Sequence, residues 1–176
     1  MKNIYGYLII AFPLLLIGAW LMTGMDGKDY QMRLENIVGH SLYNYWNLSE
    51  EIIQQKELKG EALTDAIGHL NDMVIHANVI DNATSQEILE PIAHQLIAII
   101  SGLKEKHGQT GEFTKEDKHL YQQVIADMEA MQEIMLKIFY KPNSKKGGEV
   151  LIEVKDVSEL STIHDRLVES SAMLAK

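Results

Sequence analysis

The helical period of the chain is clearest from Leu34 to Ile52, where the sequence reads LENIVGHSLYNYWNLSEEI. At 100° per residue, one set of positions with spacings of 4, 3, 4, 3 and 4 falls on a single helix face. The set consists of Leu34, Val38, Ser41, Tyr45, Leu48 and Ile52. A stripe of this kind predicts an amphipathic helix that buries one side.

Three further segments repeat the same apolar period downstream. Their stripes are Leu63, Ile67, Leu70, Val74 and Ala77, then Leu89, Ile92, Leu96, Ile99 and Leu103, then Leu120, Val124, Met128, Met131, Met135 and Ile138. Short polar breaks separate the segments, and short connections favour antiparallel neighbours. We therefore predict an all-α fold, an antiparallel bundle of four to five helices, whose main part covers residues 26–140.

The polar breaks also predict where individual helices begin and end. Lys59-Gly60 is expected to close the first helix. Thr84 to Glu87 resembles a capping box ahead of the third helix, unless Pro91 marks the first turn of that helix instead. Residues 106–111 predict a stop, and Thr114 is expected to start the fourth helix with acidic residues at its positive end.

The composition changes beyond Tyr140. Residues 141–149 form a basic loop, and residues 150–154 are rich in β-branched and other apolar side chains. Such a segment fits either a short strand or the start of a helix. Because an isolated strand would lack a partner, we favour a fifth helix, for which Ser158 is the cap, and we expect residues 150–176 to be mainly helical.

An uncharged run, IYGYLIIAFPLLLIGAWLMTGM, extends over the 22 residues from Ile4 to Met25. About 20 apolar residues suffice for a helix to cross a bilayer, so the run predicts a single transmembrane anchor. The alternative is a cleaved secretory signal, which has a shorter apolar core and a small-x-small cleavage site. We favour the uncleaved anchor because Trp20, Leu21 and Met22 interrupt the small residues near the end of the run.

Charge places the expected domain relative to the membrane and limits its partners. Lys2 precedes the run, so the positive-inside rule predicts a cytoplasmic stub at residues 1–3 and residues 26–176 outside. The chain carries 16 basic and 25 acidic residues, a formal net charge of −9. Such a surface repels nucleic acid. The absence of cysteine excludes disulfides and thiolate metal ligands.

One histidine cluster is a candidate metal site. His69, Asp72 and His76 share one face of the second segment at i, i+3 and i+7, and two imidazoles with a carboxylate suit zinc or a similar ion. The competing interpretation is a solvated polar face. No nucleophile elbow or phosphate-binding glycine loop is present in the sequence. We therefore expect no catalytic residue and no cofactor.

Two segments carry more apolar surface than one stripe requires. The predicted partner interface comprises Leu42, Tyr43, Trp46 and Ile53 in the first segment, and Tyr121, Ile125, Leu136 and Phe139 in the fourth. Two explanations are open. Either the fifth helix and residues 150–154 cover these faces within the chain, or one face docks another protein or a second copy.

These features predict a single-pass protein of the cell membrane with an extracytoplasmic helical bundle. Its expected role is an interaction, assembly or sensing subunit of an envelope complex, with a protein partner or a second copy and without catalysis of its own. The alternative is an enzyme or binding protein that holds a metal or small ligand between its helices. The outward phase of most histidines and the hydrocarbon character of the stripes argue against that alternative.

Overall fold

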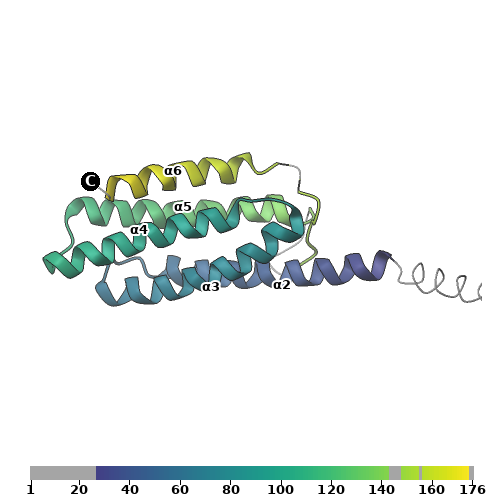
Figure 1. The fold of residues 1–176 in the computed structure, drawn as a ribbon, viewed down its shortest axis with the longest axis horizontal. Helices are drawn as coiled ribbons and strands as arrows, with labels where there is room; N and C mark the ends of the chain where they lie inside the picture. Colours follow the sequence, from purple (N-terminus) through teal and green to yellow (C-terminus); the bar gives the residue numbers. More distant parts are fainter. Residues whose placement is uncertain (1–26, 143–147, 155, 175–176) are drawn as a thin grey trace, which may run out of the picture. The chain divides into compact units, whose positions relative to one another are not determined.

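The computed structural model describes residues 27–142, 148–154 and 156–174. Its helices are α2 (Gly27–Gln54), α3 (Gly60–Thr84), α4 (Leu89–Thr110), α5 (Lys115–Phe139) and α6 (Ser158–Leu174). The prediction of an all-α helical bundle is confirmed for this part of the chain, which forms no named strand (Figure 1).

The chain divides into two compact units, residues 1–34 and residues 35–176, and the division falls within α2. Of the first unit, the structure describes the opening turns of α2, where Tyr30 is 69% and Met32 is 59% exposed. Within the described residues, no helix combines the length and apolar character that crossing a bilayer requires. The run predicted to do so, Ile4 to Met25, lies outside the described residues, as does the predicted stub.

In the second unit, α2, α3, α4 and α5 form an antiparallel bundle. The start of α5 lies beside the end of α2, because the Tyr121 hydroxyl donates to the Gln55 carbonyl at 2.7 Å. The start of α3 adjoins the end of α4, since a Cβ atom at Gly60 would lie 3.1 Å from the His107 ring. This close approach explains the glycine, and the antiparallel order agrees with the short connections.

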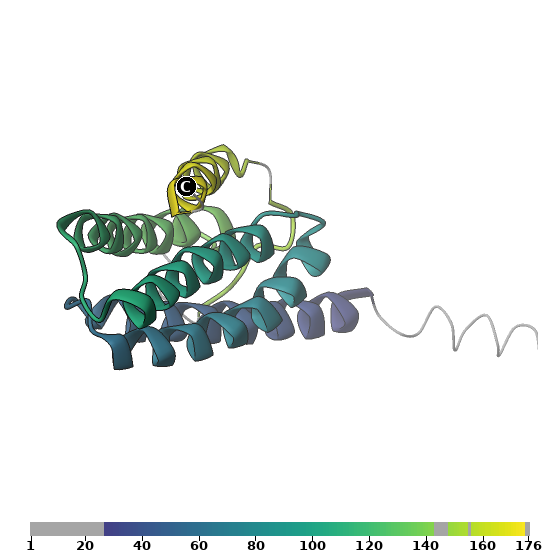
Figure 2. The same cartoon turned by 60° about the vertical axis from the view of Figure 1, so that its left-hand side comes forward.

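The fifth helix, α6, lies against both α4 and α5 (Figure 2). The Ser171 hydroxyl donates to Gln95 of α4 at 3.0 Å, and Arg166 forms an ion pair with Asp127 of α5. A Cβ atom at Gly102 would lie 3.1 Å from a Leu174 methyl group, so α6 and α4 are closely packed there. The helix therefore runs parallel to α4 and antiparallel to α5.

The predicted stripes supply nearly half of the buried apolar residues of the core. Their fully buried members, each no more than 1% exposed, are Val38, Tyr45, Ile52, Leu63, Leu70, Ala77, Leu89, Ile92, Leu96, Ile99, Leu103, Val124, Met128, Met131 and Met135. The helical period thus identified the inward face of all four bundle helices. Other stripe members, Leu48 among them, are only partly buried.

Two predicted helix ends are wrong. The first helix ends at Gln54, and Lys59-Gly60 opens α3 instead of closing α2, with Lys59 as an extended N-cap. The capping box predicted at Thr84 to Glu87 does not form, because the Thr84 hydroxyl donates back to the Ile80 carbonyl at 2.8 Å inside α3. Pro91 does lie in the first turn of α4, as the alternative interpretation had it.

The cap of α4 comes from a residue that the sequence did not suggest. The carboxylate of Asp81, in the last turn of α3, accepts hydrogen bonds from the backbone N–H groups of Ile88, Leu89 and Glu90 at 3.1, 3.2 and 2.9 Å. Asp81 is 4% exposed. Burial raises the pKa of this carboxyl, although the three N–H donors act in the opposite direction. The interaction fixes the corner between α3 and α4.

The segment before α6 is neither of the predicted elements. Val150 forms an isolated antiparallel bridge with Tyr140, flanked by the Lys141 N–H to Glu149 carbonyl bond at 3.1 Å and the Leu151 N–H to Phe139 carbonyl bond at 2.7 Å. The prediction that residues 150–154 start the fifth helix is therefore wrong, because this backbone pairs with the end of α5. A fifth helix from Ser158 is confirmed.

Candidate functional site

Most of the predicted partner interface is covered within the chain. Leu42 and Phe139 are 0% exposed, Tyr121 is 1% exposed, and Ile53 and Ile125 are 8% exposed. These five side chains belong to the core of the bundle, so the chain itself covers them. A docking surface cannot include them unless the bundle opens.

The other three predicted interface residues keep exposed area. Tyr43 is 44% exposed, and Trp46 and Leu136 are partly buried. Of the predicted interface, only these residues remain available to a partner. Nothing in their contacts identifies what that partner would be.

Trp46 lies at a polar seam between α2 and α5. The Gln132 side-chain amide donates to the Trp46 carbonyl at 3.2 Å and to the Ser49 hydroxyl at 2.6 Å, and Ser49 itself donates to the Trp46 carbonyl at 2.8 Å. The residues directly before Trp46 and Gln132 are also in contact, since the Tyr45 hydroxyl lies 3.5 Å from the Met131 sulfur. Burial raises the pKa of Tyr45, so this phenol stays neutral. The seam holds α5 on α2.

The exposed apolar side chains gather on α2. Four large apolar residues of this helix are exposed by 44–69%, and the structure describes only three others elsewhere. The four are Tyr30, Met32, Ile37 and Tyr43. Sequence reasoning missed the first three, although Tyr30, Leu34 and Ile37 continue the spacings of 4 and 3. Tyr30 and Ile37 share one face of α2 and Met32 and Tyr43 the opposite face, and these exposed apolar groups make α2 the candidate for interaction.

The histidine cluster does not converge on one point. His69 Nε2 lies 3.3 Å from a Glu51 carboxylate oxygen on α2. Burial, together with the nearby His40, lowers the pKa of His76, and Asp72 opposes that shift. Among the residues that the structure describes, no three histidine or acidic side chains are placed to hold a metal ion. The geometry therefore gives the metal hypothesis at His69, Asp72 and His76 no support.

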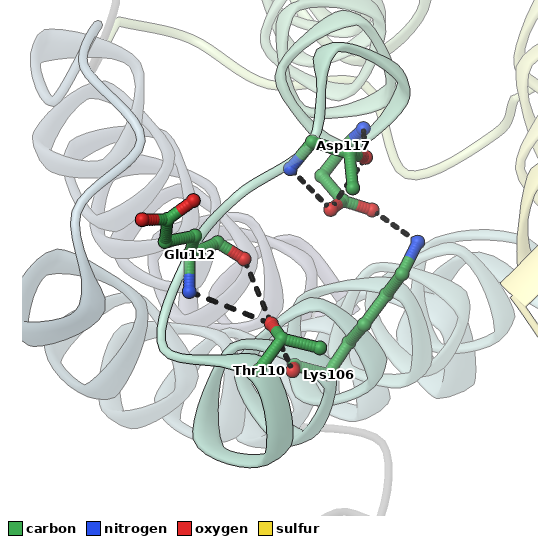
Figure 3. A network of polar contacts seen from close by, with 5 residues as sticks. Lys106, Thr110, Glu112 and Asp117 are labelled. Carbon is green, nitrogen blue, oxygen red and sulfur yellow. Dashed lines mark hydrogen bonds and ion pairs between the residues drawn. The ribbon is translucent and has the colours of Figure 1, made fainter.

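The corner between α4 and α5 carries a network of polar contacts (Figure 3). The Lys106 ammonium lies 2.6 Å from one Asp117 oxygen, and the Thr114 N–H donates to the other at 2.8 Å. The Asp117 N–H donates back to the Thr114 hydroxyl at 3.1 Å, which completes a capping box. The predicted start of this helix at Thr114 is confirmed.

Asp117 is the buried centre of this network, with an exposed fraction of 2%. Burial alone would raise the pKa of its carboxyl, but the hydrogen bonds from Lys106 and Thr114 lower the pKa below its usual range. The Thr110 hydroxyl lies 2.9 Å from the carbonyls of both Lys106 and Glu112 and closes the end of α4. Each of these groups has a structural partner, so the network positions helices and does not resemble a reactive site.

Comparisons with protein-family models, with curated proteins and with solved structures each gave no match.

Proposed function

We propose that the chain is a single-pass protein of the cell membrane whose helical bundle lies outside the cytoplasm and binds another protein. The anchor would be the uncharged run from Ile4 to Met25, whose 22 residues match the length that a membrane helix needs. Residues 26–176 would lie outside, because the basic Lys2 stays on the cytoplasmic side. The bundle would then serve an envelope complex as an interaction, assembly or sensing subunit.

The exposed apolar side chains of α2 are the observation that supports a binding role. Tyr30 and Met32 expose more than half of their surface only a few residues after the proposed anchor. Leaving large apolar groups in water costs free energy, roughly 25 cal/mol for each Å² that a partner would otherwise cover. Concentration of such groups on one helix is typical of an interaction surface.

A binding role also suits the rest of the described chain. Its buried acids have structural partners, since Asp81 caps α4 and Asp117 caps α5. The net charge of −9 disfavours nucleic acid and anionic lipid surfaces as the partner. We therefore propose a protein partner and no catalytic activity of the chain itself.

Cell fractionation and protease accessibility test the anchor and its orientation. The full chain, carrying an epitope tag after Lys176, is expected to stay in the membrane pellet after an alkaline carbonate wash. Protease added to intact spheroplasts should remove the tag, whereas a cytoplasmic control protein should survive. Extraction of the chain by carbonate would contradict the anchor, and a protected tag would contradict the orientation.

A further inference from the structure

We infer that the contact between α2 and α3 is acid-sensitive, because protonation of His40 on α2 and of His76 on α3 weakens it. The inference goes beyond the proposed binding role and does not depend on the anchor. It concerns the same face of α3 that carries the predicted metal site.

The polar faces of α2 and α3 meet in register. His69 Nε2 of α3 lies 3.3 Å from a Glu51 carboxylate oxygen of α2. Because the two helices are antiparallel neighbours, a step of seven residues back along α2 and seven forward along α3 brings Asn44 opposite His76. The Asn44 amide nitrogen lies 3.0 Å from Nε2 of His40, one turn earlier on α2. The two inferred histidines therefore lie near each other along the contact.

The contact between Asn44 and His40 requires a neutral imidazole. An amide nitrogen donates and does not accept, so in this placement of the amide His40 Nε2 is the acceptor. Protonation puts a hydrogen on that nitrogen and breaks the hydrogen bond. It also puts a positive charge close to the His76 ring.

His76 resists protonation in the folded chain. Burial lowers its pKa, the nearby His40 lowers it further, and Asp72 on the same helix acts in the opposite direction. The folded-state pKa of His76 therefore lies below the unfolded value of about 6.5, and the unfolded chain binds this proton more tightly. Stability is consequently lost as the pH falls through the unfolded value, and the loss is complete below the folded-state pKa.

The other charged groups near this contact do not cancel the effect. Protonated His69 attracts Glu51, but their side chains are 29% and 56% exposed, so the gain is small. Helix α4 also packs against α3, where Glu90 accepts a hydrogen bond from Asn78 at 2.9 Å. Asn78 lies on the opposite side of α3 from His76. Acidification therefore loosens α2 from α3 at one end of their contact.

Histidine variants of the full chain in detergent micelles test the inference by urea unfolding. His40→Gln/His76→Gln removes both protonation sites, and His119→Gln is the matched control because His119 is exposed on α5. The remaining groups titrate equally in the native chain and in both variants. Between about pH 7.5 and about pH 5.5, the unfolding constant of the double variant relative to the native chain should fall roughly three- to tenfold, and that of the control by less than about twofold.

Proton NMR titration of the His76 ring separates the effect of charge from a change in packing. In His40→Gln the pKa of His76 should rise, since the variant removes the nearby positive charge, and in His119→Gln it should stay at its native value. An unchanged pKa in His40→Gln, or a double variant with the native pH dependence, would overturn the inference. Neither readout depends on where the chain is located, so the proposed function stands or falls separately.

Discussion

One helix, α2, carries its apolar face through two environments. Towards its end, Tyr45 is 0% exposed and contacts Met131 of α5, whereas near its start Tyr30 is 69% exposed. Both tyrosines occupy apolar-face positions of the same helix. The comparison teaches that a helical period identifies a face that needs cover but does not say what covers it.

The largest expected difference between the two halves concerns packing. Leu42→Ala in the covered half should lower the free energy of unfolding by about 2–5 kcal/mol, because it leaves a cavity in a fully buried site. Ile37→Ala in the exposed half should change it by less than about 0.5 kcal/mol. Urea unfolding of the full chain in detergent micelles, followed by far-UV circular dichroism, measures both. Equal losses of unfolding free energy in Leu42→Ala and Ile37→Ala would contradict the difference in packing between the two halves of α2.

The corner between α4 and α5 should show a smaller loss in the free energy of unfolding, and this loss should depend on pH. Asp117→Asn should lower the free energy of unfolding by about 1–3 kcal/mol near neutral pH, since Lys106 loses a buried charged partner. The folded-state pKa of Asp117 lies below its unfolded value, so the native carboxylate stabilises the fold above about pH 4 and that contribution is lost on further acidification.

The pH dependence of unfolding supplies the control for this variant. Urea midpoints of the native chain and of Asp117→Asn should differ by a constant amount between pH 7 and about pH 5 and converge only below about pH 4, as expected for an aspartate with a lowered pKa. A difference that stays constant on acidification below about pH 4 would show that the variant acts through packing and not through the charge.

Removing one hydrogen bond between α2 and α5 should lower the free energy of unfolding by less than either Leu42→Ala or Asp117→Asn. Tyr121→Phe removes the hydroxyl that donates to the Gln55 carbonyl at 2.7 Å, and it keeps the buried ring. The expected loss is about 0.5–1.5 kcal/mol, the net contribution of one hydrogen bond. The same urea titration measures it. A loss as large as that of Leu42→Ala would mean that this hydrogen bond contributes as much to the covered half as apolar packing does.

The sequence was sufficient for the helices and their inward faces, because the period of a stripe depends only on local geometry. It was insufficient where a contact joins residues that become neighbours only after folding. Asp81 caps α4 from within the preceding helix, whereas the sequence pattern predicted a cap directly before α4, at Thr84. Val150 pairs with Tyr140 across a loop, which composition alone cannot indicate.

The candidate site also could not be predicted fully, because it depends on contacts that form only after folding. Leu42, Tyr121 and Phe139 were predicted as residues of a partner interface, but they are buried within the chain. Whether the chain covers such residues depends on how the helices pack against one another. Tyr30 could have been found by extending the stripe backwards from Leu34 by one step of four residues, and Ile37 lies one step of three residues after Leu34. Their exposure could not have been predicted, since it depends on where the covering helices end.

The most direct test of the account asks whether an exposed apolar side chain at the start of α2, Tyr30, is covered by a partner in the membrane. Full chains carrying Tyr30→Cys or Asn36→Cys are treated with a water-soluble maleimide, first in native membranes and then in urea. The account predicts that the position 30 variant reacts roughly tenfold more slowly than the position 36 variant in membranes, and that the two react equally in urea. Equal rates in native membranes would contradict it.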